Sequence, residues 1–189
     1  MMGYQRAVDV PPWFALRVRP RWEKCAGEVL RSKGYDEFVP LYRSRRRWSD
    51  RDKEVLVPLF PGYIFCRLLP AAYGKVLSTP GVIEFVGIGK APSPVDDGEI
   101  EAIKTIVNAR LQIEQLPFLA AGQRVRIEGG PLYGLEGILL KVGRQHRLVA
   151  SVTLLQRSVA VEVDLDWVRL ITAAGNPAAT PLIPSRQIA

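Results

Sequence analysis

The sequence predicts an α+β fold: a ferredoxin-like domain of mixed helices and strands, followed by a small all-β barrel. Two segments support the first part, because residues 22–34 and 96–111 place apolar side chains at helical spacing among strand-like runs. The second part depends on residues 122–171, where short β-branched strands follow one another without a convincing helix. We therefore expect domains at 12–111 and 122–171, a short linker at 112–121 and a disordered tail at 172–189.

The first domain alternates strands with helices along the chain. The helix over 22–34 carries Cys25, Ala26, Val29 and Leu30 on one face, and Gly34 stands where a helix-ending glycine is expected. The helix over 96–111 has a stripe of Ile100, Ile103, Val107 and Leu111, and Asp96 with Glu99 resembles a capping box. A further short helix is expected within 69–81. The expected strands are 13–18, 36–42, 54–60, 63–68 and 82–87.

The second domain shows the two-residue period of half-buried strands. Val125 and Ile127 alternate with charged residues, and Val159, Val161 and Val163 alternate with Ser158, Ala160, Glu162 and Asp164 later in the chain. Closely spaced strands of this kind are typical of a small antiparallel barrel.

Composition excludes several classes of protein. The 189 residues include 26 basic and 19 acidic ones, a formal charge of +7 that suits an anionic partner without identifying it. No apolar run approaches the ~18 residues of a membrane span, and the first dozen residues lack the apolar core of a secretory signal. With two cysteines and one histidine, we expect a cytoplasmic protein without a metal site. We also expect a monomer without a cofactor.

Two strings of residues resemble motifs of one known family. LFPGYIFCRL (59–68), followed by TPGVIEFVG (79–87), is similar to the N-terminal (NGN) domain of NusG-type transcription elongation factors. GQRVRIEGGPLYGLEGILLKV (122–142) resembles a KOW motif, which in that family forms an SH3-like barrel. The resemblance covers roughly residues 12–171 and implies a non-enzymatic factor for transcription elongation, termination and antitermination.

The resemblance implies contacts with RNA polymerase on both sides of the DNA cleft. Tyr63 and Phe65 are two residues apart in a strand, so they share one face, which the family docks on the polymerase clamp helices. An exposed apolar patch marks a protein partner, whereas burial of both strand faces is the alternative. The residues expected at the clamp helices are Phe60, Tyr63 and Phe65, and those at the opposite wall are Ala72, Tyr73, Gly74 and Lys75. Bridging the cleft would disfavour the opened, paused state.

A basic run lies between two strands of the first domain. Residues 43–53 contain six basic and two acidic side chains, and we expect a hairpin tip or loop there. Arginine suits phosphate, and a neighbouring tryptophan can stack on an exposed base. The candidate DNA contacts are Arg43, Arg45, Arg46, Arg47 and Trp48, with Arg17, Arg19 and Arg21 as an extension. A solvated hairpin tip is the alternative.

The KOW-like segment implies a further partner. In relatives this edge of the barrel recruits a ribosomal small-subunit protein or the Rho termination factor. The corresponding residues here are Leu132, Tyr133, Leu154, Leu155 and Arg157, although leucines stand where many housekeeping members carry a bulkier aromatic side chain. Barrel-capping leucines are the alternative. This departure, with the short linker and the arginine run, favours an operon-specific member over the housekeeping one.

Two other functions compete with a transcription factor. KOW modules also occur in RNA-binding and ribosomal proteins, and a charge of +7 suits RNA. The aromatic-Pro-Gly-aromatic segment argues against that alternative, because an RNA binder has no need of it. An enzyme is disfavoured because the sequence lacks a P-loop, a G-x-S-x-G elbow, an H-E-x-x-H motif and a reliable cysteine–histidine pair.

Overall fold

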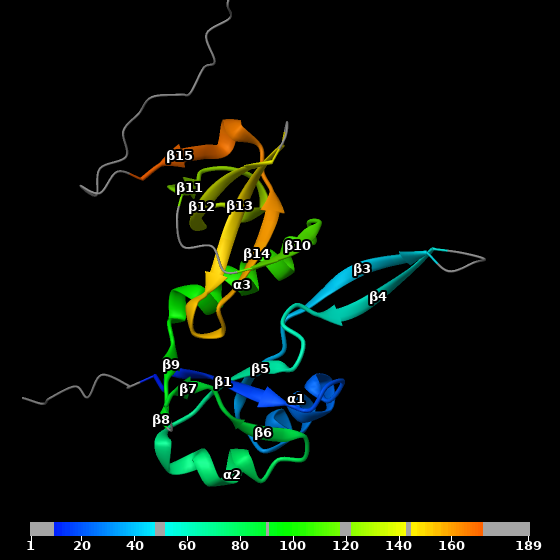
Figure 1. The fold of residues 1–189 in the computed structure, drawn as a ribbon, viewed down its shortest axis with the longest axis vertical. Helices are drawn as coiled ribbons and strands as arrows, with labels where there is room; N and C mark the ends of the chain where they lie inside the picture. Colours follow the sequence, from blue (N-terminus) through cyan, green and yellow to red (C-terminus); the bar gives the residue numbers. More distant parts are fainter. Residues whose placement is uncertain (1–9, 48–51, 90, 118–121, 143–144, 172–189) are drawn as a thin grey trace, which may run out of the picture. The chain divides into compact units, whose positions relative to one another are not determined.

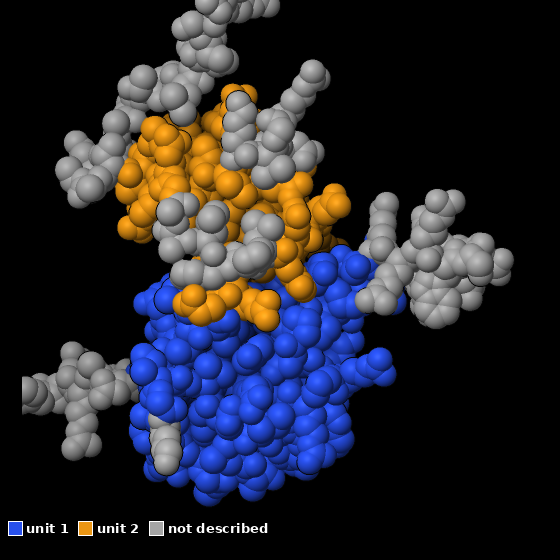
Figure 2. All heavy atoms as spheres, viewed as in Figure 1, with its two compact units in different colours: residues 1–100, 153–155 blue, residues 101–152, 156–189 orange. Residues whose placement is uncertain are grey.

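The computed structural model divides the chain into two units, which are coloured separately in Figure 2. Unit 1 comprises residues 1–100 and 153–155, and unit 2 comprises residues 101–152 and 156–189. The described residues are 10–47, 52–89, 91–117, 122–142 and 145–171. The architecture is α+β, as the sequence predicts. No helix in these ranges is long and apolar enough to cross a membrane.

Unit 1 contains an antiparallel sheet with β1 in its interior. The strand order is β2-β5-β1-β6, and β9 pairs with the beginning of β1. With α1 after β1 and α2 before β6, this is the ferredoxin-like β-α-β-β-α-β order. The strands are β1 (Trp13–Val18), β2 (Asp36–Phe38), β5 (Tyr63–Arg67), β6 (Val82–Phe85) and β9 (Pro94–Val95).

One face of this sheet packs on two helices. The helix α1 (Glu23–Ser32) contributes Ala26 and Leu30 to a core shared with strands β1 and β5. The short turn η1 (Pro70–Ala72) and the helix α2 (Tyr73–Leu77) contribute Val76. Lys33, at the end of α1, donates a hydrogen bond of 3.2 Å to the Lys75 carbonyl oxygen in α2 and another of 2.8 Å to Thr79 Oγ1, and so ties the two helices together. The core is Phe14, Leu16, Val18, Ala26, Leu30, Ile64, Cys66, Leu68 and Val76.

The cysteines have different surroundings. Cys66 is fully buried, and burial raises the pKa of its thiol from 9.0 to about 12, with Asp36 and Glu37 adding to the shift. Cys25 is exposed, although the sequence pattern places it on the apolar face of the helix. Four residues of α1 share an apolar stripe in the sequence, but only the side of the stripe with Ala26 and Leu30 faces the sheet.

A long hairpin, β3 (Leu41–Arg47) with β4 (Asp52–Pro58), projects from unit 1 as a two-stranded ribbon (Figure 1). The sequence places residues 43–53 in a hairpin tip, whereas the structure extends the paired strands through Arg47 and from Asp52. The backbone register pairs Arg45 with Glu54 and Arg47 with Asp52, so the arginine run belongs to a paired strand.

The helix α3 (Asp97–Asn108) begins in unit 1 and continues in unit 2. The Asp96 carboxylate accepts the backbone N–H of Glu99 at 3.2 Å, which is half of the predicted capping box. The helix ends before Leu111, because Arg110 adopts a left-handed conformation with φ of 55°. The buried stripe is therefore Ile100, Ile103 and Ile106, and the predicted end at Leu111 is wrong.

Unit 2 is built on a six-stranded antiparallel sheet in the order β10-β14-β13-β12-β11-β15. Residues 113–117, predicted as linker, form β10 and pair with β14. In β14 the expected alternation fails, because Ser158 and Ala160 are buried together with the valines. Closure of the sheet into a barrel stays a prediction. The strands are β10 (Ile113–Pro117), β11 (Gln123–Ile127), β12 (Glu136–Val142), β13 (Gln145–Val152), β14 (Arg157–Glu162) and β15 (Val168–Leu170).

The remaining described elements are short. They are β7 (Gly87–Ile88), β8 (Ala91–Pro92), η2 (Gly130–Leu132), η3 (Thr153–Leu155) and η4 (Leu165–Trp167). The predicted tail, residues 172–189, lies outside the described residues.

Candidate protein-binding surface

The Pro61–Gly62 turn sets the direction of the strand that carries Tyr63. Gly62 has φ of +83°, a conformation that side-chain-bearing residues rarely adopt. The turn is closed by a hydrogen bond of 3.0 Å from the Tyr63 N–H to the Phe60 carbonyl oxygen. Another bond, 2.8 Å long, runs from the Val18 N–H to the Gly62 carbonyl oxygen. The turn therefore fixes where β5 begins beside β1.

The three aromatic residues around this turn are not equally accessible. Phe60 and Phe65 are buried, with exposed fractions of 3% and 0%, whereas Tyr63 is half-buried. The Phe65 ring stacks on Phe38 at a centroid distance of 6.0 Å and meets the edge of Phe60 at 6.2 Å. The expectation that Phe60 and Phe65 form an exposed patch is therefore wrong, because the three phenylalanine rings pack on one another.

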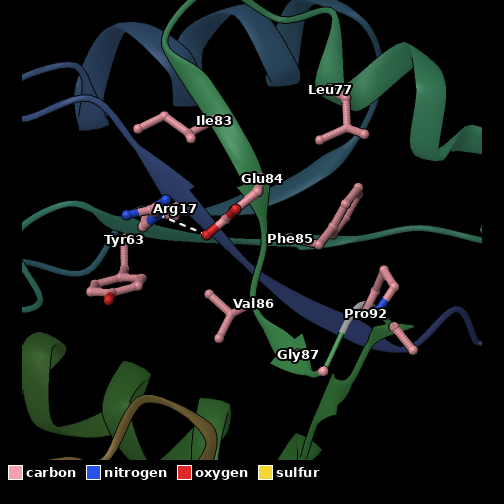
Figure 3. Close-up of a pocket in the computed structure, with 11 residues that line it drawn as sticks. Arg17, Tyr63, Leu77, Ile83, Glu84, Phe85, Val86, Gly87 and Pro92 are labelled. Atoms are coloured by element: carbon pink, nitrogen blue, oxygen red, sulfur yellow. Dashed lines mark ion pairs between the residues drawn. The ribbon is translucent and has the colours of Figure 1, made fainter.

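Tyr63 instead lines a pocket of about 650 Å³ around the edge strand β6 (Figure 3). Its walls combine apolar and polar surface in similar measure, and both Leu77 and Ile83 are more than two-fifths exposed. A concave site that combines exposed apolar side chains with a few polar groups suits the binding of a partner. The lining residues are Arg17, Tyr63, Leu77, Ile83, Glu84, Phe85, Val86, Gly87, Gly89, Ala91 and Pro92.

A β-bulge shapes this pocket. Arg17 pairs with Glu84 across β1 and β6, but the next residue, Val18, pairs with Val82 and leaves Ile83 as the extra residue. The bulge leaves the Ile83 side chain 45% exposed in the pocket wall. Sequence reasoning did not identify Ile83, Leu77 or Glu84, because a bulge cannot be inferred from the V-I-E-F pattern.

The polar part of the pocket is an ion pair. Arg17 Nε lies 2.9 Å from Glu84 Oε1, and Figure 3 shows the two side chains pointing toward each other near Tyr63. Both side chains are about half exposed, so the pair contributes little to folding stability. Its effect is to present one positive and one negative group beside an aromatic ring.

The Ala72–Lys75 segment divides into packed and accessible residues. The Tyr73 ring contacts Phe14 and Phe85 at centroid distances of 5.3 and 4.6 Å, and burial raises the pKa of its hydroxyl. Gly74 and Lys75 are exposed in the first turn of α2. A partner can therefore reach Gly74 and Lys75, whereas Tyr73 mainly supports the sheet.

The basic run is only partly described. Arg43 is exposed, and its guanidinium lies 3.0 Å from a carboxylate oxygen of Glu54. Arg45, Arg46 and Arg47 belong to β3 by their backbone, but their side chains lie outside the described residues, as does all of Trp48. The structure therefore places the backbone of the arginine run on a strand.

The contact residues predicted from the KOW-like segment also differ in access, and two of them, Leu154 and Leu155, belong to unit 1. Leu132 is buried and Tyr133, which follows η2, is 74% exposed; Arg157 is exposed at the start of β14. Leu154 is half-buried and Leu155 is buried in η3. Of these residues, Tyr133 and Arg157 are the exposed ones.

Three arginines on β11 and β15 have carboxylate partners. Arg126 is hydrogen-bonded to Glu136, Arg124 lies 3.6 Å from the same carboxylate, and Arg169 lies 3.2 Å from Glu128. The hydrogen bond to Glu136 is the main reason why the pKa of the Arg126 guanidinium is raised. Among the described residues, no group of three or more histidine, cysteine or acidic side chains is placed to hold a metal ion.

Comparisons with known proteins identify relatives along most of the chain. The family model described as transcription termination factor nusG matches residues 11–104. A NusG from Borreliella burgdorferi, named a transcription termination/antitermination protein, is 33% identical over 84% of this chain and 98% of that protein. The protein of the same name from Thermus thermophilus is 29% identical over 74% of this chain and 82% of its own length.

A solved structure of Thermotoga maritima NusG is 22% identical over 83% of this chain and 95% of that one, with a TM-score of 0.49. The sequence matches support the assignment to a family, since the relative from Borreliella burgdorferi exceeds 30% identity and this chain covers almost all of its length. This chain belongs to the NusG family of transcription termination and antitermination factors.

Proposed function

We propose that this protein binds RNA polymerase through unit 1 and thereby modulates elongation, termination and antitermination. The observation that carries the proposal is the pocket at Tyr63, with exposed Leu77 and Ile83 beside an ion pair, which lies at the family's aromatic-Pro-Gly-aromatic segment. Tyrosine suits an anchoring role, because its ring adds apolar contact area while its hydroxyl keeps a hydrogen-bonding group at the rim. This role requires no covalent chemistry by the protein.

Phe60 and Phe65 support this site from beneath. Both are buried against each other, so their contribution is to hold β5 and the turn in place. The direct contacts that we propose are Tyr63 and the exposed parts of Leu77 and Ile83. The Arg17–Glu84 pair sets the orientation of the partner, because opposite charges on a pocket rim favour a complementary arrangement.

A second contact at Gly74 and Lys75 would let unit 1 touch both walls of the DNA cleft. Both residues are exposed and belong to the segment that the family places there. A ligand that binds the closed polymerase better than the open form shifts the population toward the closed form. Suppression of pausing would follow from this preference.

The β3–β4 hairpin is the proposed contact with non-template DNA. The candidates are Arg43 and the arginines at 45–47, carried on a projecting two-stranded ribbon. Contacts with phosphates would weaken steeply as salt increases. Arg43 has a carboxylate partner at 3.0 Å, so a phosphate would have to compete with Glu54.

We also propose that unit 2 is a KOW barrel whose surface around Tyr133 and Arg157 recruits a further protein. A ribosomal small-subunit protein and Rho are the two candidates that the family suggests. RNA binding by this unit is the alternative function. Three arginines of β11 and β15 already have carboxylate partners, which reduces their availability for phosphate and favours a protein partner.

The experiment is a pull-down of core RNA polymerase with the native chain and with Tyr63→Ala. Tyr133→Ala is the matched control, because it removes an equally large aromatic side chain from unit 2. We expect Tyr63→Ala to retain much less polymerase than the native chain, while Tyr133→Ala retains as much as the native chain. Equal retention by all three proteins would exclude the Tyr63 pocket as the anchor. Failure of the native chain to bind polymerase, with binding to ribosomes instead, would support the alternative.

A further inference from the structure

Two Pro-Gly turns of unit 1 meet the same segment, the β1–α1 turn formed by residues 19–23. The first is the Pro61–Gly62 turn before β5. Its Gly62 N–H donates a hydrogen bond of 2.9 Å to Glu23 Oε1, while the Gly62 carbonyl oxygen accepts from the last residue of β1, Val18, at 2.8 Å. Both backbone groups of Gly62 are therefore held by the end of β1 and the start of α1.

The second is the Pro80–Gly81 turn between α2 and β6. Its Gly81 carbonyl oxygen accepts the Arg19 N–H at 2.8 Å. The Trp22 side chain lies against Gly81 so closely that a Cβ at this position would be 2.6 Å from Trp22 Cε3. Gly81 also has φ of +88°, so both the space and the backbone conformation require glycine there.

The β1–α1 turn has features of a rigid connection. Arg21 adopts φ of 68°, a costly conformation for a residue with a side chain. The turn is closed by a bond of 3.0 Å from the Trp22 N–H to the Arg19 carbonyl oxygen. Glu23 is only 4% exposed, although a carboxylate is costly to bury without partners. Its position in the first turn of α1 and its bond to Gly62 offset that cost.

We propose that Glu23 is a positioning residue, and that the β1–α1 turn fixes the spacing between the two surfaces that contact polymerase. Gly62 directly precedes Tyr63, the proposed anchor, and Gly81 connects α2, which carries Gly74 and Lys75, to the pocket strand β6. A domain that bridges two walls needs a fixed distance between its contacts, because misplaced contacts cannot form together. This inference rests on the proposed function.

The first test uses the unbound protein, so that it does not depend on polymerase binding. Hydrogen exchange of the Gly62 amide is measured by NMR in the native chain, in Glu23→Ala and in Glu23→Gln. We expect about tenfold faster exchange in Glu23→Ala, because a charge-assisted hydrogen bond is lost. Glu23→Gln keeps an acceptor oxygen and should stay close to native. Unchanged exchange in Glu23→Ala would overturn the positioning role.

The second test measures polymerase affinity in a double-mutant cycle with Glu23→Ala and Tyr63→Ala. If Glu23 acts through Tyr63, the double variant should bind no more weakly than Tyr63→Ala alone, since coupled residues are not additive. Fully additive losses would show that Glu23 does not act through Tyr63. Glu23→Gln should restore affinity to within about twofold of native, because it keeps the acceptor.

Trp22→Ala keeps the proposal testable if Glu23→Ala does not fold. It removes the ring from Gly81 and leaves the Gly62 bond in place. We expect faster amide exchange in the Pro80–Gly81 turn, weaker polymerase binding and an unchanged Gly62 amide. Native-like binding despite a loosened Gly81 turn would overturn the idea that the spacing matters.

If the native chain itself does not bind polymerase, the proposed function and the spacing claim both fail, whereas the Gly62 exchange result still decides whether Glu23 holds the turn.

Discussion

Unit 1 buries the phenylalanines that border its Pro61–Gly62 turn, whereas unit 2 leaves aromatic side chains near its Gly129–Gly130 turn at the surface. Phe65 is fully buried against Phe38 and Phe60. Tyr133 is 74% exposed, and Trp167 is 38% exposed although its indole lies on the two glycines. An aromatic residue beside a glycine turn can thus be a core residue or a surface residue. The neighbouring rings and strand register decide which.

The largest effect that separates the two regions is expected from Phe65→Ala. The substitution empties a site between two aromatic rings and should lower the free energy of unfolding by about 3–5 kcal/mol. Tyr133→Ala should change it by less than about 0.5 kcal/mol, because the side chain is at the surface. Urea denaturation of both variants measures the difference. Similar small effects would mean that the phenylalanine cluster is not a packed core.

Two glycines sharpen the comparison within unit 2. Gly130 and Gly134 both have positive φ, 68° and 80°, but only Gly130 faces the indole, where a Cβ would lie 2.3 Å from Trp167 Cζ3. Gly134 has no atom within 4 Å of its Cβ position. We expect Gly130→Ala to cost about 1–3 kcal/mol more than Gly134→Ala, since overpacking adds to the shared backbone strain. Equal melting-temperature shifts would mean that Trp167 moves away at little cost.

The cysteines extend the comparison to two environments within unit 1. Exposed Cys25 should react with a thiol reagent at pH 8, whereas Cys66 should react only after unfolding. A count of two reactive thiols in the native chain would contradict the burial of Cys66.

The raised pKa of Cys66 also predicts a pH dependence. Above pH 9.0 the unfolded chain loses the thiol proton, while the folded chain keeps it until about pH 12. The unfolded state then binds fewer protons, so stability should fall by up to about 1.4 kcal/mol for each pH unit in this window. In Cys66→Ala this part of the decline should disappear. An identical slope in that variant would assign the decline to other groups.

The sequence predicts the elements of this molecule better than the accessibility of its residues. The spacing of apolar residues and the positions of glycine and proline locate α1, α3 and most strands, because those signals are local in the sequence. Tyr63 and Phe65 illustrate the limit: their spacing correctly predicts one shared face, but the rings of Phe38, from another strand, and of Phe60, before the turn, determine that Phe65 is covered. The bulge at Ile83 and the strand β10 were missed for the same reason, since each depends on its pairing partner.

The smallest effect is expected at the Arg17–Glu84 pair, which tests whether the pocket serves binding or folding. Both side chains are about half exposed, so Glu84→Gln should change the free energy of unfolding by less than about 1 kcal/mol. Glu84→Arg places two positive charges at the pocket rim and should weaken polymerase binding while the fold persists. A variant with the same charge change on unit 2, Glu162→Arg, controls for net charge, because Glu162 is exposed on β14. If both arginine variants weaken binding equally, net charge and not the pocket determines affinity; a loss confined to Glu84→Arg would support the Tyr63 pocket as the place where the polymerase binds.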